Sequence, residues 1–129
     1  MSDKLRRILI VDDDIDILAN LTDILSDLGY ETVTACSGQS ALEQIDASHS
    51  KSSLPFDLCL LDFRMPGMDG VELLKQIQAK QPKIPAIMIT AYAGADGDKR
   101  AEAAGTLTVM KKPVDIKRLL RLIDAVVAC

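Results

Sequence analysis

Asp62 stands where an apolar run of the sequence stops at a loop. The residues before it, 58–61, are Leu-Cys-Leu-Leu, and Pro66, Gly67 and Gly70 follow it. A continuously apolar run is typical of a parallel strand that helices cover on both faces. Because ligands bind outside the carboxyl ends of such strands, a carboxylate at this position is available for chemistry.

Further polar residues stand at the ends of other predicted strands. They are Asp12, Asp13, Thr90 and Lys112. Since all strands of a parallel sheet end at the same edge, these side chains are expected to gather there with Asp62. Any one of them alone could simply cap a helix or face water. Their number and their order along the chain favour a functional site.

Three carboxylates at close range repel one another. They either keep raised pKa values or bind a hard divalent cation that prefers oxygen ligands, for which we expect Mg²⁺. With the metal bound, Asp62 could attack phosphorus as a carboxylate nucleophile and form an aspartyl phosphate. The Lys112 ammonium and the Thr90 hydroxyl would then interact with the phosphoryl oxygens.

Five strands and five helices in alternation must position these residues. Apolar and β-branched runs predict strands at 5–11, 31–35, 58–62, 86–90 and 107–110. Apolar residues three and four apart predict helices at 14–28, 40–47, 71–80 and 116–127, with a short helix before Gly105. Alternating strands and helices imply right-handed crossovers and one doubly wound parallel α/β sheet.

Several local features follow from the same patterns. The strand at 31–35 is predicted to lie at an edge, and the serine-rich segment 48–53 to be a mobile connection. Asp14 is expected to cap the first helix, and Gly29 to end it. Lys111 is expected to point away from Lys112, because side chains alternate along a strand.

The composition indicates one cytoplasmic domain that spans residues 1–129. Hydrophobic residues make up 48% of the chain and aromatic residues 3%, so the core is built from aliphatic side chains. A net charge of −4 argues against non-specific binding to nucleic acid. No apolar run approaches the roughly 18 residues that would cross a membrane, and we expect neither a signal peptide nor membrane association.

The cysteines and the single histidine are not predicted to take part in chemistry. Cys36, Cys59 and Cys129 are too irregularly spaced for a disulfide framework or a zinc site, and Cys59 is expected in the core. His49 lies in a polar stretch and is expected to be solvated. A mechanism that needs an internal histidine base is therefore disfavoured.

The motifs at the predicted strand ends resemble those of response regulator receiver domains of bacterial two-component signalling. The matching pieces are Ile10-Val11-Asp12-Asp13, Leu61-Asp62, Met65-Pro66-Gly67-Met68-Asp69-Gly70, Ile89-Thr90-Ala91 and Lys112-Pro113. The resemblance covers essentially the whole chain. It implies a flavodoxin-like fold, with five parallel strands in the order 2-1-3-4-5 and five helices.

The resemblance also implies roles for the site residues. Asp62 would be the phosphoacceptor; Asp13, Asp62 and the backbone carbonyl of Arg64 would bind Mg²⁺, with Asp12 acting through water. Thr90 and Lys112 would contact the phosphoryl group, and the Lys112–Pro113 peptide bond would be cis. The domain would undergo self-phosphorylation and autodephosphorylation but would not be an enzyme.

The implied partners are a sensor histidine kinase or a histidine phosphotransfer protein, which supplies the phosphoryl group, and a downstream effector or an output domain. A homodimer is compatible with the resemblance. In the family, an aromatic residue three positions before the lysine takes part in the switch, and Val109 stands there instead. Tyr92 either substitutes for that residue or has a simple surface role.

Two other functions stay open at this point. A phosphatase or phosphotransferase with an aspartate nucleophile commonly needs a second acid two residues on, where this chain has Arg64. A receiver-like scaffold that binds partners without phosphorylation is favoured slightly by Val109. The end of the chain at Cys129 fits both a stand-alone regulator and a receiver from a longer protein.

Overall fold

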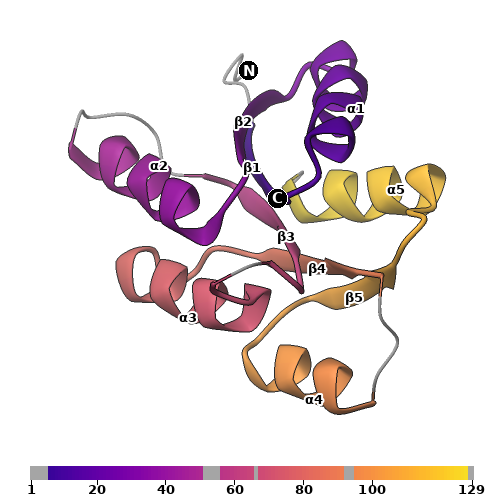
Figure 1. Ribbon diagram of the computed structural model, residues 1–129. Coiled ribbons are helices and arrows are strands. Elements are labelled where there is room, and N and C mark those ends of the chain that lie inside the picture. The colour runs from indigo at the N-terminus through magenta and orange to yellow at the C-terminus, as the bar shows by residue number, and fades with distance from the viewer. Residues whose placement is uncertain (1–5, 51–55, 66, 92–94, 128–129) are drawn as a thin grey trace.

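The computed structural model describes residues 6–50, 56–65, 67–91 and 95–127, with the backbone alone at 47–50 and 95–98 (Figure 1). The predictions about the side chains of His49, Tyr92 and Cys129 fall outside this description, as does the serine-rich segment beyond Ser50.

Five parallel strands form one sheet in the order β2-β1-β3-β4-β5. They are β1 (Arg7–Val11), β2 (Glu31–Ala35), β3 (Leu58–Asp62), β4 (Ala86–Thr90) and β5 (Thr108–Lys111). The predicted fold class and strand order are confirmed, and β2 lies at an edge as expected. Every residue of β3 and β4 is buried, as a parallel sheet covered on both faces requires.

Helices cover both faces of this sheet. They are α1 (Ile15–Asp27), α2 (Gly38–Ser50), α3 (Gly70–Lys80), α4 (Ala95–Ala103) and α5 (Ile116–Val127). Alternate residues of β1 point to opposite faces: Leu9 belongs to the core cluster on the side of α2, α3 and α4, whereas Ile8 belongs to the cluster on the side of α1 and α5. The two layers of helices are separated by the sheet in Figure 1.

Several predicted boundaries were wrong by one to three residues, among them the start of β1 at Arg7 and both ends of α2. α2 continues to Ser50, into the segment expected to be a mobile connection. Serine and histidine lower helix stability by only tenths of a kcal/mol per residue, so a helix that packs through Ala41 and Ile45 can continue across them. β5 runs one residue later than predicted, because its register is set by pairing with β4, in which Thr90 faces Lys111.

Local predictions around α1 are confirmed. The Asp14 carboxylate accepts hydrogen bonds from the backbone N–H groups of Asp16 at 3.0 Å and Ile17 at 3.4 Å, which makes it the N-cap. Gly29 follows the helix with a φ of 92°, a conformation that residues with a Cβ rarely adopt. The cap and the stop therefore set both ends of the helix that follows β1.

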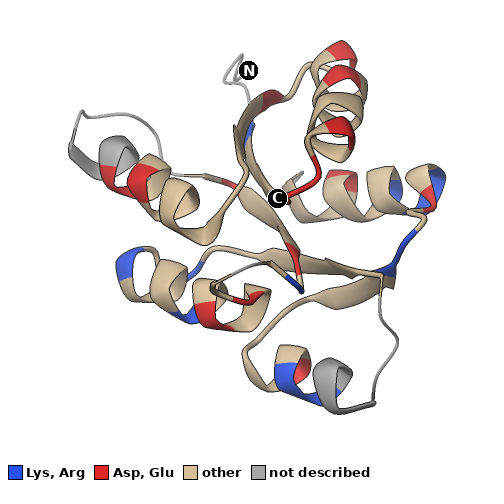
Figure 2. Ribbon diagram, viewed as in Figure 1, with Lys and Arg blue, Asp and Glu red and all other residues tan. Residues whose placement is uncertain are grey.

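The helices on the α1 face carry opposite charges (Figure 2). α1 contains three aspartates and no lysine or arginine, whereas α5 contains Lys117, Arg118 and Arg121 beside a single acid, Asp124. Exposed charges of this kind attract weakly, so apolar packing dominates the contact between the two helices. None of the described helices is long and apolar enough to cross a membrane.

Candidate functional site

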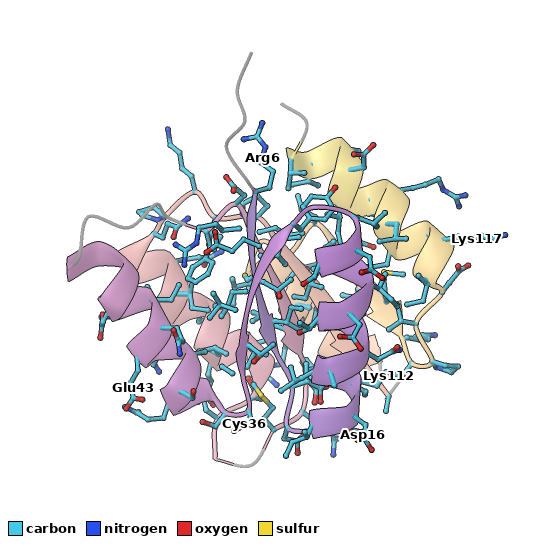
Figure 3. The ribbon with its side chains drawn as sticks, turned by 90° about the horizontal axis from the view of Figure 1, so that it is seen from above. Arg6, Asp16, Cys36, Glu43, Lys112 and Lys117 are labelled. Atoms are coloured by element: carbon cyan, nitrogen blue, oxygen red, sulfur yellow. The ribbon has the colours of Figure 1, made fainter. Side chains whose placement is uncertain are left out.

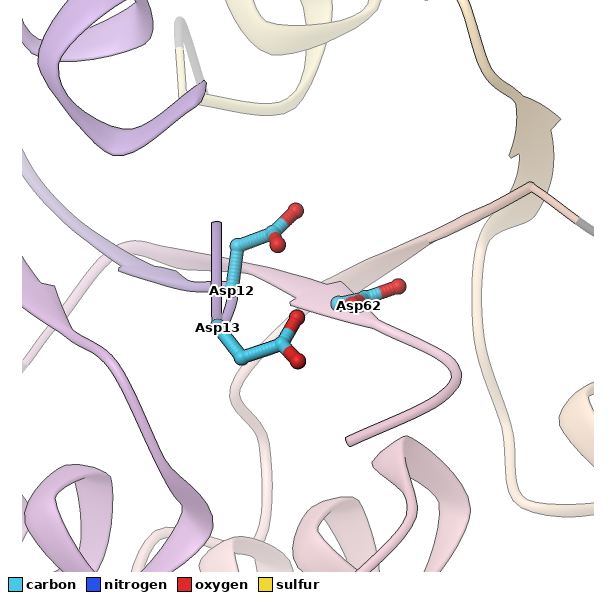
Figure 4. A group of neighbouring side chains, drawn as sticks. All are labelled: Asp12, Asp13 and Asp62. Atoms are coloured by element: carbon cyan, nitrogen blue, oxygen red, sulfur yellow. The ribbon is translucent and has the colours of Figure 1, made fainter. Parts of the chain in front are cut away.

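The ends of β1 and β3 bring three carboxylates together (Figure 4). One oxygen from each of Asp12, Asp13 and Asp62 lies within 4.8 Å of the other two. The register pairs Val11 with Leu61, so the residues after them leave adjacent strands at the same level. Asp12 is 3% exposed and Asp62 5%, whereas Asp13 is exposed to solvent. The cluster thus has a buried base and an open side.

Lys112 supplies a positive charge to this cluster. Its Nζ lies 3.0 Å from Asp12 Oδ2 and 3.5 Å from Asp62 Oδ1. The residue directly follows β5, and its backbone N–H donates to the carbonyl of Thr90 at 2.7 Å. The Lys112–Pro113 peptide bond is cis, as the sequence resemblance implied. Lys111, one residue earlier, is exposed as predicted.

Asp12 has a partner for each carboxylate oxygen. Oδ2 accepts from Lys112, and Oδ1 accepts from the backbone N–H of Asp14 at 2.9 Å. Both oxygens of the buried Asp12 carboxylate are therefore held in place by the protein. Figure 4 shows the side chains of Asp12, Asp13 and Asp62 next to one another at the ends of β1 and β3.

Thr90 and Arg64 lie at the same end of the sheet as Asp62. Thr90 is 3% exposed at the end of β4, where the register pairs Asp62 with the preceding residue, Ile89. Arg64 is exposed in the loop after β3, and its backbone N–H is hydrogen-bonded to the Asp62 carboxylate. The predicted residues therefore come from four different strand ends, all at one edge of the sheet.

The site lies at the carboxyl ends of the strands, and the described chain begins at the opposite end of the sheet. In Figure 3, Arg6 lies at one end of the molecule, while Cys36 and Asp16 lie at the other. Cys36 directly follows β2 and Asp16 belongs to the first turn of α1, so both mark the carboxyl ends of the strands. Among the described residues, the acidic cluster that could hold a cation is Asp12, Asp13 and Asp62, without Cys36.

The electrostatics of the site leave an excess of negative charge. Burial and the Asp12 carboxylate raise the pKa of Asp62 from 3.8 to about 6, although Lys112 and the Arg64 backbone N–H act in the opposite direction. Burial lowers the pKa of Lys112, but Asp12 and Asp62 outweigh this and hold the pKa above its usual value. One ammonium does not balance three carboxylates, so a divalent cation would stabilise the charged site.

Gly70 holds the loop after Asp62 close to the site. Its N–H donates to the Phe63 carbonyl at 2.8 Å, and a Cβ built on Gly70 would lie 2.4 Å from the Asp62 carbonyl oxygen. The chain can return this close only without a side chain. From the sequence, Gly70 was interpreted only as a breaker of regular structure, so this packing role was missed.

Asp69 is a second residue whose role was missed. Its Oδ1 accepts from the backbone N–H of Glu72 at 2.9 Å and caps α3. An acidic residue followed three positions later by Glu, just before an apolar run, is a signal for a helix start that the sequence does contain. Its Oδ2 accepts from Arg100 on α4, a contact that no local pattern indicates.

The comparison with protein families decides what kind of domain this is. The family model of the response regulator receiver domain matches residues 8–124. The chain belongs to this family. The fold and the acidic edge described above are those of a receiver domain in two-component phosphorelay signalling.

Similar proteins agree with this assignment. The receiver domain is 38% identical over 121 residues to transcriptional regulatory protein ZraR of Escherichia coli K12, covering 94% of this chain and 26% of ZraR. It is 36% identical over 113 residues to sporulation initiation phosphotransferase F of Bacillus subtilis, covering 88% of this chain and 86% of that protein. The chain thus spans about a quarter of the length of ZraR but most of the second relative.

Solved receiver structures superpose closely on this domain. The CheY-like receiver domain protein of Methanospirillum hungatei is 34% identical, with a TM-score of 0.86 over 97% of this chain and 95% of that chain. CheY of Borrelia burgdorferi, solved in a complex with CheX, BeF₃ and Mg²⁺, is 29% identical with a TM-score of 0.82. That match covers 94% of this chain and 88% of the other.

Proposed function

We propose that Asp62 accepts a phosphoryl group from a phosphohistidine, in a reaction that requires Mg²⁺. The donor would be a sensor histidine kinase or a histidine phosphotransfer protein. Phosphorylation would then change how the domain binds a downstream effector or an output domain of a longer protein. The observation that carries this proposal is the meeting of Asp62 with Asp12, Asp13 and Lys112 at one edge of the sheet.

The donor set suits Mg²⁺. Asp13, Asp62 and the backbone carbonyl of Arg64 would be its protein ligands, with Asp12 acting through water. The bound ion would offset the carboxylate charges and the charge that develops on the phosphoryl oxygens. The similar Borrelia burgdorferi CheY was solved in a complex that contains BeF₃ and Mg²⁺, which supports the choice of this ion.

The residues of the chain would carry the transfer as follows. An ionised Asp62 oxygen attacks phosphorus, the new O–P bond forms, and the P–N bond to the donor histidine breaks with its electron pair returning to the imidazole. Lys112 lies close enough to Asp62 to bind an oxygen of the incoming group. The Thr90 hydroxyl would donate to another oxygen. Positioning and charge stabilisation would supply the catalysis.

We propose no turnover of a separate substrate beyond self-phosphorylation and autodephosphorylation. Arg64 occupies the position two residues after Asp62 where a phosphatase of the aspartate type would need an acid, and its side chain is exposed. We further propose that the receiver unit spans residues 1–129 and acts in the cytoplasm. A homodimer and a stand-alone regulator are both compatible with this proposal.

A phosphodonor assay tests the proposal. The wild-type protein, incubated with Mg²⁺ and a phosphorylated kinase or a small phosphodonor, should gain one phosphoryl group by intact-mass spectrometry. Asp62→Asn should gain none, whereas the matched control Asp23→Asn, on the exposed side of α1, should be labelled like the wild type. Labelling that survives Asp62→Asn would contradict the proposed acceptor, and failure of the wild type to be labelled or to bind Mg²⁺ would favour a scaffold role.

A further inference from the structure

One side chain of α4 contacts both ends of the loop that follows Asp62. Arg100 Nη2 lies 2.9 Å from Asp69 Oδ2, and the guanidinium carbon of Arg100 lies 5.7 Å from the centroid of the Phe63 ring. Phe63 is the residue directly after Asp62, and Asp69 is the last residue before α3. Arg100 therefore joins the first and the last residue of loop 63–69 to a helix that is distant in the sequence.

Backbone hydrogen bonds fix the ends of this loop next to the site. The Phe63 N–H donates to the Ile89 carbonyl, and the Phe63 carbonyl accepts from the Gly70 N–H, both at 2.8 Å. Asp69 divides its two oxygens between the cap of α3 and Arg100. Both ends of the loop are therefore fixed by hydrogen bonds next to Asp62. A displacement of Arg100 would consequently be transmitted to the residues beside the phosphoacceptor.

A cavity lies beside this contact. Phe63, Arg64, Met65, Asp69 and Arg100 line a cavity of about 480 Å³. Ala101 is the buried side chain in the part of α4 whose side chains are described, and it belongs to the same core cluster as Met65. The exposed Arg100 therefore contacts the loop at the wall of this cavity, whereas Ala101 anchors α4 in the core.

We propose that Arg100 is a positioning residue that couples the order of α4 to the state of Asp62 through Phe63 and Asp69. This inference rests on the proposed phosphorylation of Asp62. Binding of Mg²⁺ and a phosphoryl group, here called loading of the site, would restrict the motion of the loop between Phe63 and Asp69. Through Arg100, the loop would then restrict the motion of α4. Because coupling between two sites is reciprocal, a partner that moves α4 would change the affinity of the site for Mg²⁺ and for a phosphoryl group by the same factor.

The size of the coupling follows from the exposure of the pair. The side chain of Arg100 is 49% exposed and that of Asp69 is 26% exposed. Ion pairs of this kind contribute little, and the stacking of Arg100 on Phe63 adds a comparable amount. We therefore expect effects of about two- to fivefold on equilibrium and exchange measurements, not a loss of the site.

Hydrogen exchange measures the coupling with Mg²⁺ and beryllium fluoride as the probe of the loaded site. In the wild type, loading should slow amide exchange in α4 by about two- to fivefold. In Arg100→Ala the site should still load, with an affinity for Mg²⁺ about two- to fivefold weaker, but the slowing in α4 should disappear. The matched control Lys99→Ala, an exposed cation on the same helix, should behave like the wild type.

A double-mutant cycle separates coupling from a structural effect. Asp69→Asn keeps a residue that caps α3 equally well but removes the charge that Arg100 contacts. Arg100→Ala should abolish the response of α4, Asp69→Asn should reduce it because the contact with Phe63 remains, and the double variant should lose no more than Arg100→Ala alone. If Arg100 only stabilised the fold, Arg100→Ala would lower the melting temperature, but loading of the site would still slow amide exchange in α4 as it does in the wild type.

The outcomes distinguish this inference from the proposed function. If the wild type loads and α4 responds equally in Arg100→Ala, the coupling is refuted while phosphorylation of Asp62 stands. If the two substitutions have additive effects on the response, Arg100 does not act through Asp69. If the wild type binds neither Mg²⁺ nor beryllium fluoride, the proposed function fails and the coupling fails with it.

Discussion

Substitution of Asp62 by asparagine should stabilise the metal-free protein at neutral pH, although it removes the proposed phosphoacceptor. In the folded protein, burial and the Asp12 carboxylate raise the pKa of Asp62 to about 6. Above that pH the folded state must hold an ionised carboxylate that the unfolded state hydrates freely. Asparagine has nearly the same shape and carries no charge, so Asp62→Asn relieves this cost.

The magnitude follows from the difference between the two pKa values. A rise from 3.8 to about 6 corresponds to up to about 3 kcal/mol of destabilisation of the wild type at pH 7.5. The side chain is only 5% exposed, so solvent screens little of this. For a domain of this size, the melting temperature of Asp62→Asn should be several degrees higher.

The pH dependence has a definite sign. Because the folded pKa lies above the unfolded value, the folded state binds the proton more tightly, and the wild type gains stability relative to Asp62→Asn as the pH falls from about 6 to about 4. The advantage of the variant should therefore be fully present at pH 7.5 and largely gone by about pH 4. Mg²⁺ should reduce the advantage at pH 7.5, because the ion offsets the same charge.

Urea unfolding followed by far-UV circular dichroism, with a chelator present, measures the difference. The chain contains no tryptophan, so fluorescence is less informative. Asp23→Asn on α1 is the matched control and should stay within about 0.5 kcal/mol of the wild type. The reasoning is refuted if Asp62→Asn is no more stable than the wild type at pH 7.5, or if its advantage is unchanged at low pH.

Three further substitutions test the geometry around the site. Gly70→Ala should destabilise the protein by about 1–3 kcal/mol in urea unfolding and slow phosphorylation, because its Cβ would overlap the Asp62 carbonyl; a wild-type midpoint would contradict this close approach. Asp14→Ala should cost about 1 kcal/mol through loss of the α1 cap, whereas Asp14→Asn should cost much less; equal losses would exclude capping. Lys112→Met should slow phosphoryl transfer in a single-turnover assay and further raise the pKa of Asp62, and an unchanged rate would remove Lys112 from the mechanism.

The regular elements were largely predictable because burial in a parallel sheet imposes strong patterns. The uninterrupted apolar runs of β3 and β4 and the apolar stripe of α5 were found with accurate boundaries. The end of α2 was missed because serine and histidine neither favour nor forbid a helix strongly. The start of β5 was missed because pairing with β4, rather than the local sequence, sets it.

The sequence by itself determined that the residues after β1, β3, β4 and β5 meet, because parallel strands joined by right-handed crossovers all end at one edge. Only the tertiary structure decided that Lys112 lies nearer to Asp12 than to Asp62, and that Gly70 packs against the Asp62 carbonyl. It also brought Arg100 to Asp69 across 31 positions of the chain. Local patterns report which faces are buried, whereas contacts between distant side chains depend on how packed elements and rotamers fit together in three dimensions.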